Sequence, residues 1–179
     1  MKYQDCIQPA QAPDEPADGS AAGAARLADA NINPATGLAT DYLNHFNEAI
    51  MLLEMLASCP ECLDDFLAWR PLSYREHFAG SRFKGRDLAI AAYDAAEPAL
   101  RESLDELTGS MTAMLQATRA ALRSGLPPDA GGLIAEAAAA WLKPLIARAG
   151  ALINGEADTE RGQPSAPQAV VDRLMRRSA

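Results

Sequence analysis

The chain has 179 residues, of which 49% are apolar, 22% charged and 6% aromatic, and its formal net charge is −8. This length predicts one domain with a substantial core. The acidic balance argues against a nucleic acid or an anionic membrane surface as partner. No apolar run approaches the roughly 20 residues that a membrane-spanning helix needs, and residues 1–18 lack the apolar stretch of a secretory signal. We therefore expect a cytoplasmic protein.

Alanine is the most biased residue type. The sequence holds 38 alanines, and 13 arginines against 3 lysines, a composition typical of GC-rich bacterial genomes. Alanine has the highest helix propensity, β-branched residues are few, and no segment alternates apolar with polar residues. The sequence therefore predicts an all-α protein, an antiparallel bundle of four or five helices.

The two ends of the chain differ from its middle. Residues 1–32 hold several prolines and glycines but few large apolar side chains, which predicts a disordered, mobile arm with a helical tendency over residues 21–30. Residues 33–154 are the expected bundle domain. Residues 155–179 are predicted to be a polar linker followed by a short amphipathic helix. The apolar face of that helix is made of Val170, Val171, Leu174 and Met175.

Breaks at prolines and glycines divide the middle of the chain into helices. The predicted segments are 38–58, 60–69, a short helix capped by Ser73 with Glu76, 86–96, 98–124 and 129–153. In the two longest segments apolar residues repeat at steps of three and four, as in a heptad seam. The seams are Leu100, Leu104, Leu107, Met111, Met114, Thr118 and Ala121, and then Ile134, Ala138, Trp141, Leu145, Ala149 and Leu152. Such seams close within one chain or across the axis of a homodimer.

Cys59 and Cys62 form a C-x-x-C motif, which can be a redox pair or half of a metal site. His77 follows fifteen residues after Cys62, a permissible spacing for a third ligand of zinc or iron. However, a predicted helix precedes the motif where a redox fold has a strand, and no second C-x-x-C exists. The competing interpretation is two ordinary thiols at a helix junction.

The two histidines suggest further chemistry. Asp41, His45 and Glu48 are spaced to share one helix face, as a metal or general-base site requires. The same face lies opposite the apolar stripe, so the favoured interpretation is a solvated polar face. Neither His45 nor His77 lies in a phosphotransfer motif.

Arg82, Lys84 and Arg86 belong to the one basic cluster, a loop that contains two glycines and leads into a helix. This arrangement can hold a phosphate or carboxylate group. It can equally pair with the acidic helices of the same fold, which is the favoured interpretation.

No catalytic constellation emerges from these motifs. We therefore expect a regulator or adaptor that binds another protein and has no catalytic activity. We expect no cofactor, and neither a nucleic acid nor a membrane as partner. A homodimer is compatible with the apolar seams. The alternative is a metal-binding or thiol-redox protein that uses Cys59 and Cys62, with zinc or iron as the metal.

Overall fold

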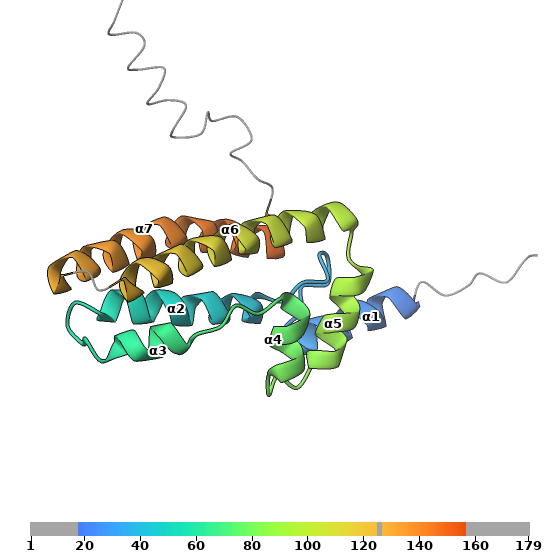
Figure 1. Ribbon diagram of the computed structural model, residues 1–179. Coiled ribbons are helices and arrows are strands. Elements are labelled where there is room, and N and C mark those ends of the chain that lie inside the picture. Colours follow the sequence, from blue (N-terminus) through green and yellow to red (C-terminus); the bar gives the residue numbers. More distant parts are fainter. Residues whose placement is uncertain (1–17, 125–126, 157–179) are drawn as a thin grey trace, which may run out of the picture.

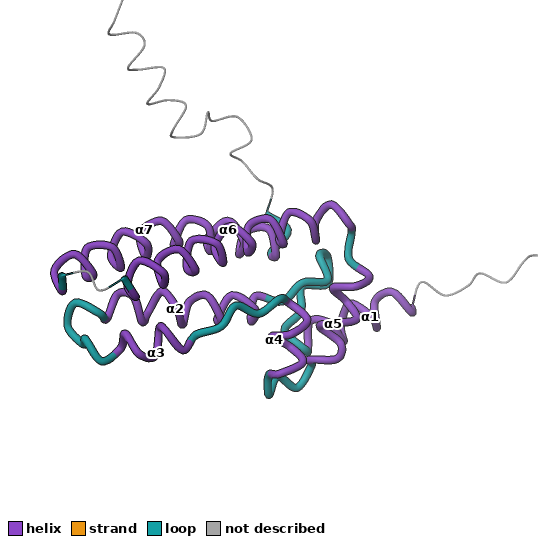
Figure 2. The backbone as a smooth tube through the Cα atoms, viewed as in Figure 1, coloured by secondary structure: helices purple, strands orange, loops and turns teal. Residues whose placement is uncertain are grey.

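The computed structural model describes residues 18–124 and 127–156, and within these ranges it contains helices and no strand (Figure 2). This confirms the predicted all-α class. The elements are α1 (Asp18–Asp29), the 3-10 helix η1 (Thr40–Leu43), α2 (Asn44–Met55), α3 (Cys62–Ala68), α4 (Tyr74–Gly80), α5 (Arg86–Ala95), α6 (Pro98–Arg123) and α7 (Pro128–Ile153). The predicted amphipathic tail and the first part of the predicted arm lie outside the described residues.

The two longest helices, α6 and α7, run antiparallel and side by side as one layer of the molecule (Figure 1). Helix α2 lies against this layer and contacts α7, and α3 lies on the far side of α2. Helices α4 and α5 contact each other at the end of the molecule that lies away from the α6–α7 connection. Helix α1 lies at the same end as α4 and α5. The fold therefore combines a long helical hairpin with a group of shorter helices.

Helix boundaries mostly follow the predicted breaks. Pro98 begins α6, and Ser73 caps α4 in a capping box in which Glu76 completes the reciprocal hydrogen bonds. The helix predicted over 38–58 is shorter in the structure. Leu38 and Ala39 precede the 3-10 helix η1, and α2 ends at Met55.

The ordered fold begins before residue 33. Helix α1 matches the predicted helical tendency, its Leu27 packs against the core, and Ile32 is buried. The connection that follows crosses the end of α7, where the Thr36 hydroxyl donates a hydrogen bond of 2.6 Å to the carbonyl of Ile153. Gly37 has a positive φ of 72°, which a residue with a side chain rarely adopts. These contacts tie the first helix and the last helix together.

The buried face of α7 matches the predicted seam only in part, at Ala138 and Ala149. Trp141 was expected to face the core, but it is 65% exposed. The buried positions of α7 are Ala135, Ala138, Ala139, Leu142, Ala149 and Ile153. Small side chains fill this face because α2 and α6 both approach α7 closely, which leaves no room for an indole ring. Helix α6 is closer to the prediction, since Leu104, Met111 and Thr118 are buried.

Candidate functional site

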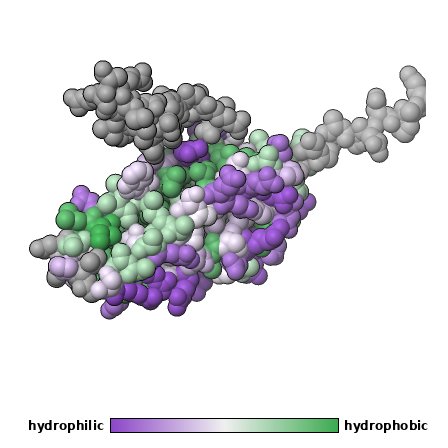
Figure 3. Space-filling model, turned by 45° about the horizontal axis from the view of Figure 1, so that its top comes forward, coloured by the Kyte–Doolittle hydropathy of each residue, from purple (hydrophilic) through white to green (hydrophobic). Residues whose placement is uncertain are grey.

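The α6–α7 layer packs one of its faces against the core and leaves apolar side chains open on the other. Leu133 is 68% exposed and Trp141 is 65% exposed, although both are large apolar residues. Ala137, Ala140 and Pro144 are also exposed, and their spacing from Leu133 places them on the same side of α7. In Figure 3 apolar surface gathers over this layer. We call these five residues and the groove described next the outer face of α6–α7.

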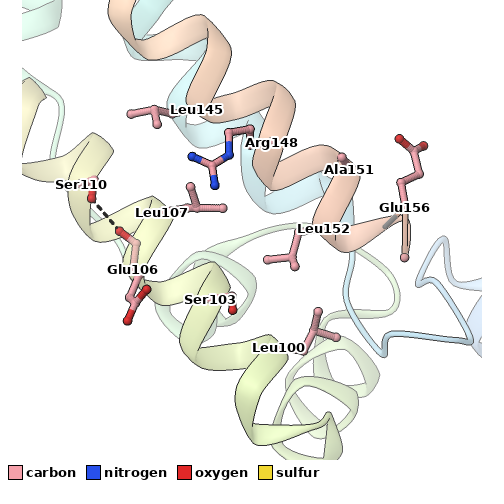
Figure 4. Close-up of a pocket in the computed structure, with 11 residues that line it drawn as sticks. Leu100, Ser103, Glu106, Leu107, Ser110, Leu145, Arg148, Ala151, Leu152 and Glu156 are labelled. Atoms are coloured by element: carbon pink, nitrogen blue, oxygen red, sulfur yellow. Dashed lines mark hydrogen bonds between the residues drawn. The ribbon is translucent and has the colours of Figure 1, made fainter. Parts of the chain in front are cut away.

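A groove of about 610 Å³ runs between α6 and α7 where α6 begins and α7 ends (Figure 4). Leu100 and Leu107 line it from α6, and Leu145 and Leu152 line it from α7. These four leucines are half-buried against the core and leave part of their surface in the groove. Each of the two helices therefore contributes two leucines to the groove.

Polar groups lie among these leucines. The Ser110 hydroxyl donates to the carbonyl of Glu106 at 2.9 Å, and the Ser103 hydroxyl donates to the carbonyl of Ala99 at 2.8 Å. Both hydroxyls thus donate their hydrogen bonds within α6. The Arg148 side chain extends from α7 toward α6 (Figure 4), and Glu156 lies at the end of the groove. This mixture of apolar walls and a few charges suits contact with another chain better than a catalytic reaction.

A second groove, of about 450 Å³, lies between α7 and α2. Leu53 and Ala139 line its floor, and an ion pair between Lys143 and Glu54 joins the two helices across it. Both partners of this pair are about half exposed. Helix α7 therefore stands between two grooves.

The structure brings two of the three predicted metal ligands together. The Sγ atoms of Cys59 and Cys62 lie 2.6 Å apart. The hydrogen bond to Cys59, together with burial, raises the pKa of the Cys62 thiol to about 11. His77 instead contacts Asp41 and His45. Within the described residues no group of three or more His, Cys, Asp or Glu side chains could hold a metal ion.

His45 does not lie on a solvated face, contrary to the sequence interpretation. It is buried, and its ring stacks on Trp69 with 4.6 Å between ring centroids. Its Nε2 is buried without a hydrogen-bond partner among the described residues, and burial, followed by the nearby His77, lowers its pKa. The segment after α3 carries Trp69 back across α2, a tertiary contact that helix periodicity does not reveal. Glu48 is exposed as expected.

Asp41 joins this cluster through His77. The Nε2 atom of His77 lies 3.3 Å from Oδ2 of Asp41, and the His77 ring centroid is 6.1 Å from that of His45. The structure thus gathers both histidines of the chain beside a carboxylate and an indole ring. The sequence analysis assigned His77 to a metal site and His45 to a polar helix face, and it did not predict that the two rings lie close together.

The predicted anion-binding residues lie around the loop between α4 and α5. Arg82, Lys84 and Arg86 are all exposed, and the Arg86 guanidinium lies 3.6 Å from the carboxylate of Asp87. Within the described part of the chain neither Arg82 nor Lys84 forms an ion pair. The favoured pairing with acidic helices of the same fold is therefore not seen for these two side chains.

Sequence reasoning missed three tyrosine hydroxyls that each form a hydrogen bond with a residue far away in the sequence. Tyr93 donates to Asp105 at 2.8 Å, Tyr42 donates to the carbonyl of Leu72 at 2.9 Å, and Tyr74 accepts from an amide at 2.9 Å. Burial raises the pKa of Tyr42 and that of Tyr93 to about 12. These hydroxyls line a cleft of about 480 Å³, and each of them has a partner within the fold. No sequence signal links them, because their partners are at least twelve residues away.

Helix α7 also differs from the expectation about apolar runs. Among the described residues one segment, Ala130–Ile153, is long and apolar enough by length and composition to cross a membrane, and 22% of that window is buried. A core helix of a soluble protein also meets this criterion but is mostly buried, so length and composition alone do not assign α7 to a membrane.

Comparison with protein-family models, with curated proteins and with solved structures finds no match for this chain.

Proposed function

We propose that this protein works by binding another protein, with the outer face of α6–α7 as its docking surface and an apolar helix of the partner as the ligand. The observation that carries the proposal is the exposure of Leu133 and Trp141 on the helix whose opposite side forms the core. Catalysis and a cofactor form no part of this function, and we place it in the cytoplasm.

The exposed side chains have the chemistry of binding anchors. Full burial of a large apolar side chain contributes about 1.5–3 kcal/mol, so covering Leu133 and Trp141 favours association. Tryptophan is enriched among the residues that dominate binding energy at protein interfaces. The leucine-lined groove beside Trp141 supplies the second element of helix-in-groove recognition, in which one apolar helix face fills a hydrophobic channel.

A protein partner fits α7 better than a lipid bilayer. Glu136, Lys143 and Arg148 are spread along the apolar helix, and Lys143 is tied to α2 by its ion pair with Glu54. Placing charges within hydrocarbon costs several kcal/mol per residue, about 2.5–3.5 by insertion scales. A docked helix would cover the side of the α6–α7 layer that faces away from α2. We further propose that the chain's own helices form the antiparallel four- or five-helix bundle expected from the sequence.

Site-specific photocrosslinking tests the proposal. A benzoylphenylalanine at position 133 is expected to give one discrete protein adduct in cells, and Trp141→Asp is expected to abolish it. Ala91 on α5 is exposed at the other end of the molecule and supplies the matched position for both the crosslinker and an Ala91→Asp control. The control crosslinker should give no such adduct, and Ala91→Asp should leave the adduct at position 133 unchanged.

Other outcomes overturn the proposal. An adduct of twice the mass of the chain would identify a second copy as the occupant, and crosslinks to lipid would identify a membrane. Identical adducts from positions 133 and 91, or none from either, would show that the outer face of α6–α7 is not a docking surface.

A second candidate function rests on the close approach of Cys59 and Cys62, which favours a thiol-redox protein. A zinc or iron site at this pair would need ligands from outside the described residues. Native mass spectrometry of protein purified without added metal, compared with the denatured mass, tests for such a metal.

A further inference from the structure

We infer that Cys59 and Cys62 are an oxidisable dithiol, which a small neutral hydroperoxide converts into an intramolecular disulfide. It rests on the second candidate function, the thiol-redox protein, and is independent of the docking surface on α6–α7. It assigns a modification site to the corner between α2 and α3, and it names the oxidant by its chemical class.

The geometry of the corner brings the two sulfur atoms together. Cys59 follows the end of α2, Cys62 is the first residue of α3, and the amide of Cys62 donates a hydrogen bond of 3.0 Å to the carbonyl of Cys59. The turn thus fixes both backbone positions, and the Sγ atoms lie 2.6 Å apart. A disulfide bond is about 2.05 Å long, so closing the bond requires only a small movement.

The two thiols differ in accessibility, which sets the order of the steps. Cys59 is half-buried and can meet a small oxidant, whereas Cys62 is 6% exposed. The Cys59 thiolate attacks one peroxide oxygen, the O–O bond breaks, and the products are a sulfenic acid and an alcohol, or water from hydrogen peroxide. The Cys62 sulfur then attacks the Cys59 sulfur, the S–O bond breaks, and the hydroxyl leaves as water with the Cys62 proton. In sum, two thiols and one hydroperoxide give one disulfide, one alcohol and one water.

The charges around the corner favour a neutral oxidant. Glu61, Asp64 and Asp65 are exposed within three residues of Cys62, and one basic residue, Arg70, follows them before α4 begins. A cluster of carboxylates repels an anionic oxidant such as glutathione disulfide but not a neutral peroxide.

The test exposes the full, prereduced chain to hydrogen peroxide and then counts reactive thiols with iodoacetamide by intact mass. We expect the mass to fall by two hydrogen atoms and two of the three cysteines to lose alkylation, while Cys6 remains alkylated. Peptide mapping should locate the bond between Cys59 and Cys62, and dithiothreitol should restore all three thiols. Glutathione disulfide at the same concentration should react more slowly, because the carboxylates around the corner repel its negative charges.

Matched variants separate the steps. Cys62→Ser should stop the reaction at a sulfenic acid on Cys59 that dimedone traps, Cys59→Ser should leave Cys62 unmodified, and Cys6→Ser should behave as the unmodified chain. Circular dichroism checks that each variant is folded. The inference is overturned if all three thiols survive the peroxide, if the disulfide includes Cys6, if glutathione disulfide reacts as fast as the peroxide, or if native mass spectrometry finds a metal ion bound to the pair.

Discussion

Two regions of this protein solve the packing problem in different ways. The shorter helices and their connections, residues 42–93, contain all the described aromatic side chains except Trp141. Phe46, Phe66 and Phe78 are fully buried there. The α6–α7 hairpin is aliphatic and rich in alanine, and its one aromatic residue, Trp141, is mostly exposed. We call these regions the aromatic half and the hairpin.

The difference shows that the largest side chains of the core are concentrated in the aromatic half. Short helices meet at irregular angles, and large rings fill the gaps between them, as the stacked rings of Tyr74 and Tyr93 do at 4.5 Å. Long helices with alanine faces pack closely but need few large side chains to do so. In the hairpin the large apolar residues Leu133 and Trp141 remain exposed, and the proposed function uses them as contacts for a partner.

The sharpest test of this comparison sets one ring from each region against the other. Phe78 is fully buried against Tyr74 and Phe83, so Phe78→Ala should lower the free energy of unfolding by about 3–5 kcal/mol. Trp141→Ala should lower it by less than about 0.5 kcal/mol. Urea unfolding measures both. Equal losses would contradict the comparison and show that Trp141 is covered in solution.

The aromatic half should also carry a pH dependence that the hairpin lacks. Burial lowers the pKa of His45, so the unfolded chain, whose histidine keeps a pKa near 6.5, takes up a proton first as the pH falls. Stability should therefore decrease between about pH 7.5 and about pH 5.5, by at most about 1.4 kcal/mol per pH unit.

Urea unfolding across that range, compared with His45→Gln, isolates this contribution. The variant should show a flatter pH profile than the unmodified chain, whereas Trp141→Ala, as a control from the hairpin, should keep the full slope. Parallel profiles for His45→Gln and the unmodified chain would show that His45 does not couple folding to protonation.

The capping box of α4 should contribute a smaller amount. Ser73→Ala removes the hydroxyl that accepts from the Glu76 amide at 3.3 Å and should cost about 1 kcal/mol. Ser73→Asp should retain most of the stability because a carboxylate also caps a helix. These hydrogen bonds lower the pKa of Glu76, so its titration, followed by nuclear magnetic resonance, should shift upward in Ser73→Ala. An unshifted titration would mean that the box is not formed in solution.

The smallest effect is expected at the ion pair that joins the hairpin to α2. Lys143 and Glu54 are both about half exposed, so solvent screens their attraction and Lys143→Ala should change the free energy of unfolding by less than about 0.5 kcal/mol. Thermal and urea unfolding measure the change. A loss above about 1 kcal/mol would indicate that the second groove is closed in solution and the pair is desolvated.

Local sequence patterns predicted the helices well and the site poorly. The prolines at 60, 71 and 98 mark breaks that are present in the structure, because a proline ring restricts the backbone wherever it stands. Trp141 was assigned to the core because it falls at the three- and four-residue steps of the predicted seam. His45 was assigned to solvent because the helix face that it shares with Asp41 and Glu48 lies opposite the apolar stripe.

The sequence by itself determined the all-α class, the long α6–α7 hairpin and the cap at Ser73, since each depends on residues within a few positions of one another. Tertiary structure alone decided which side of α7 is buried and which ring covers His45. These features arise where segments far apart in the chain meet, as when Trp69 stacks on His45 and donates a hydrogen bond to its carbonyl. An alanine-rich helix has apolar residues on every side, so only its packed neighbours determine which side remains exposed.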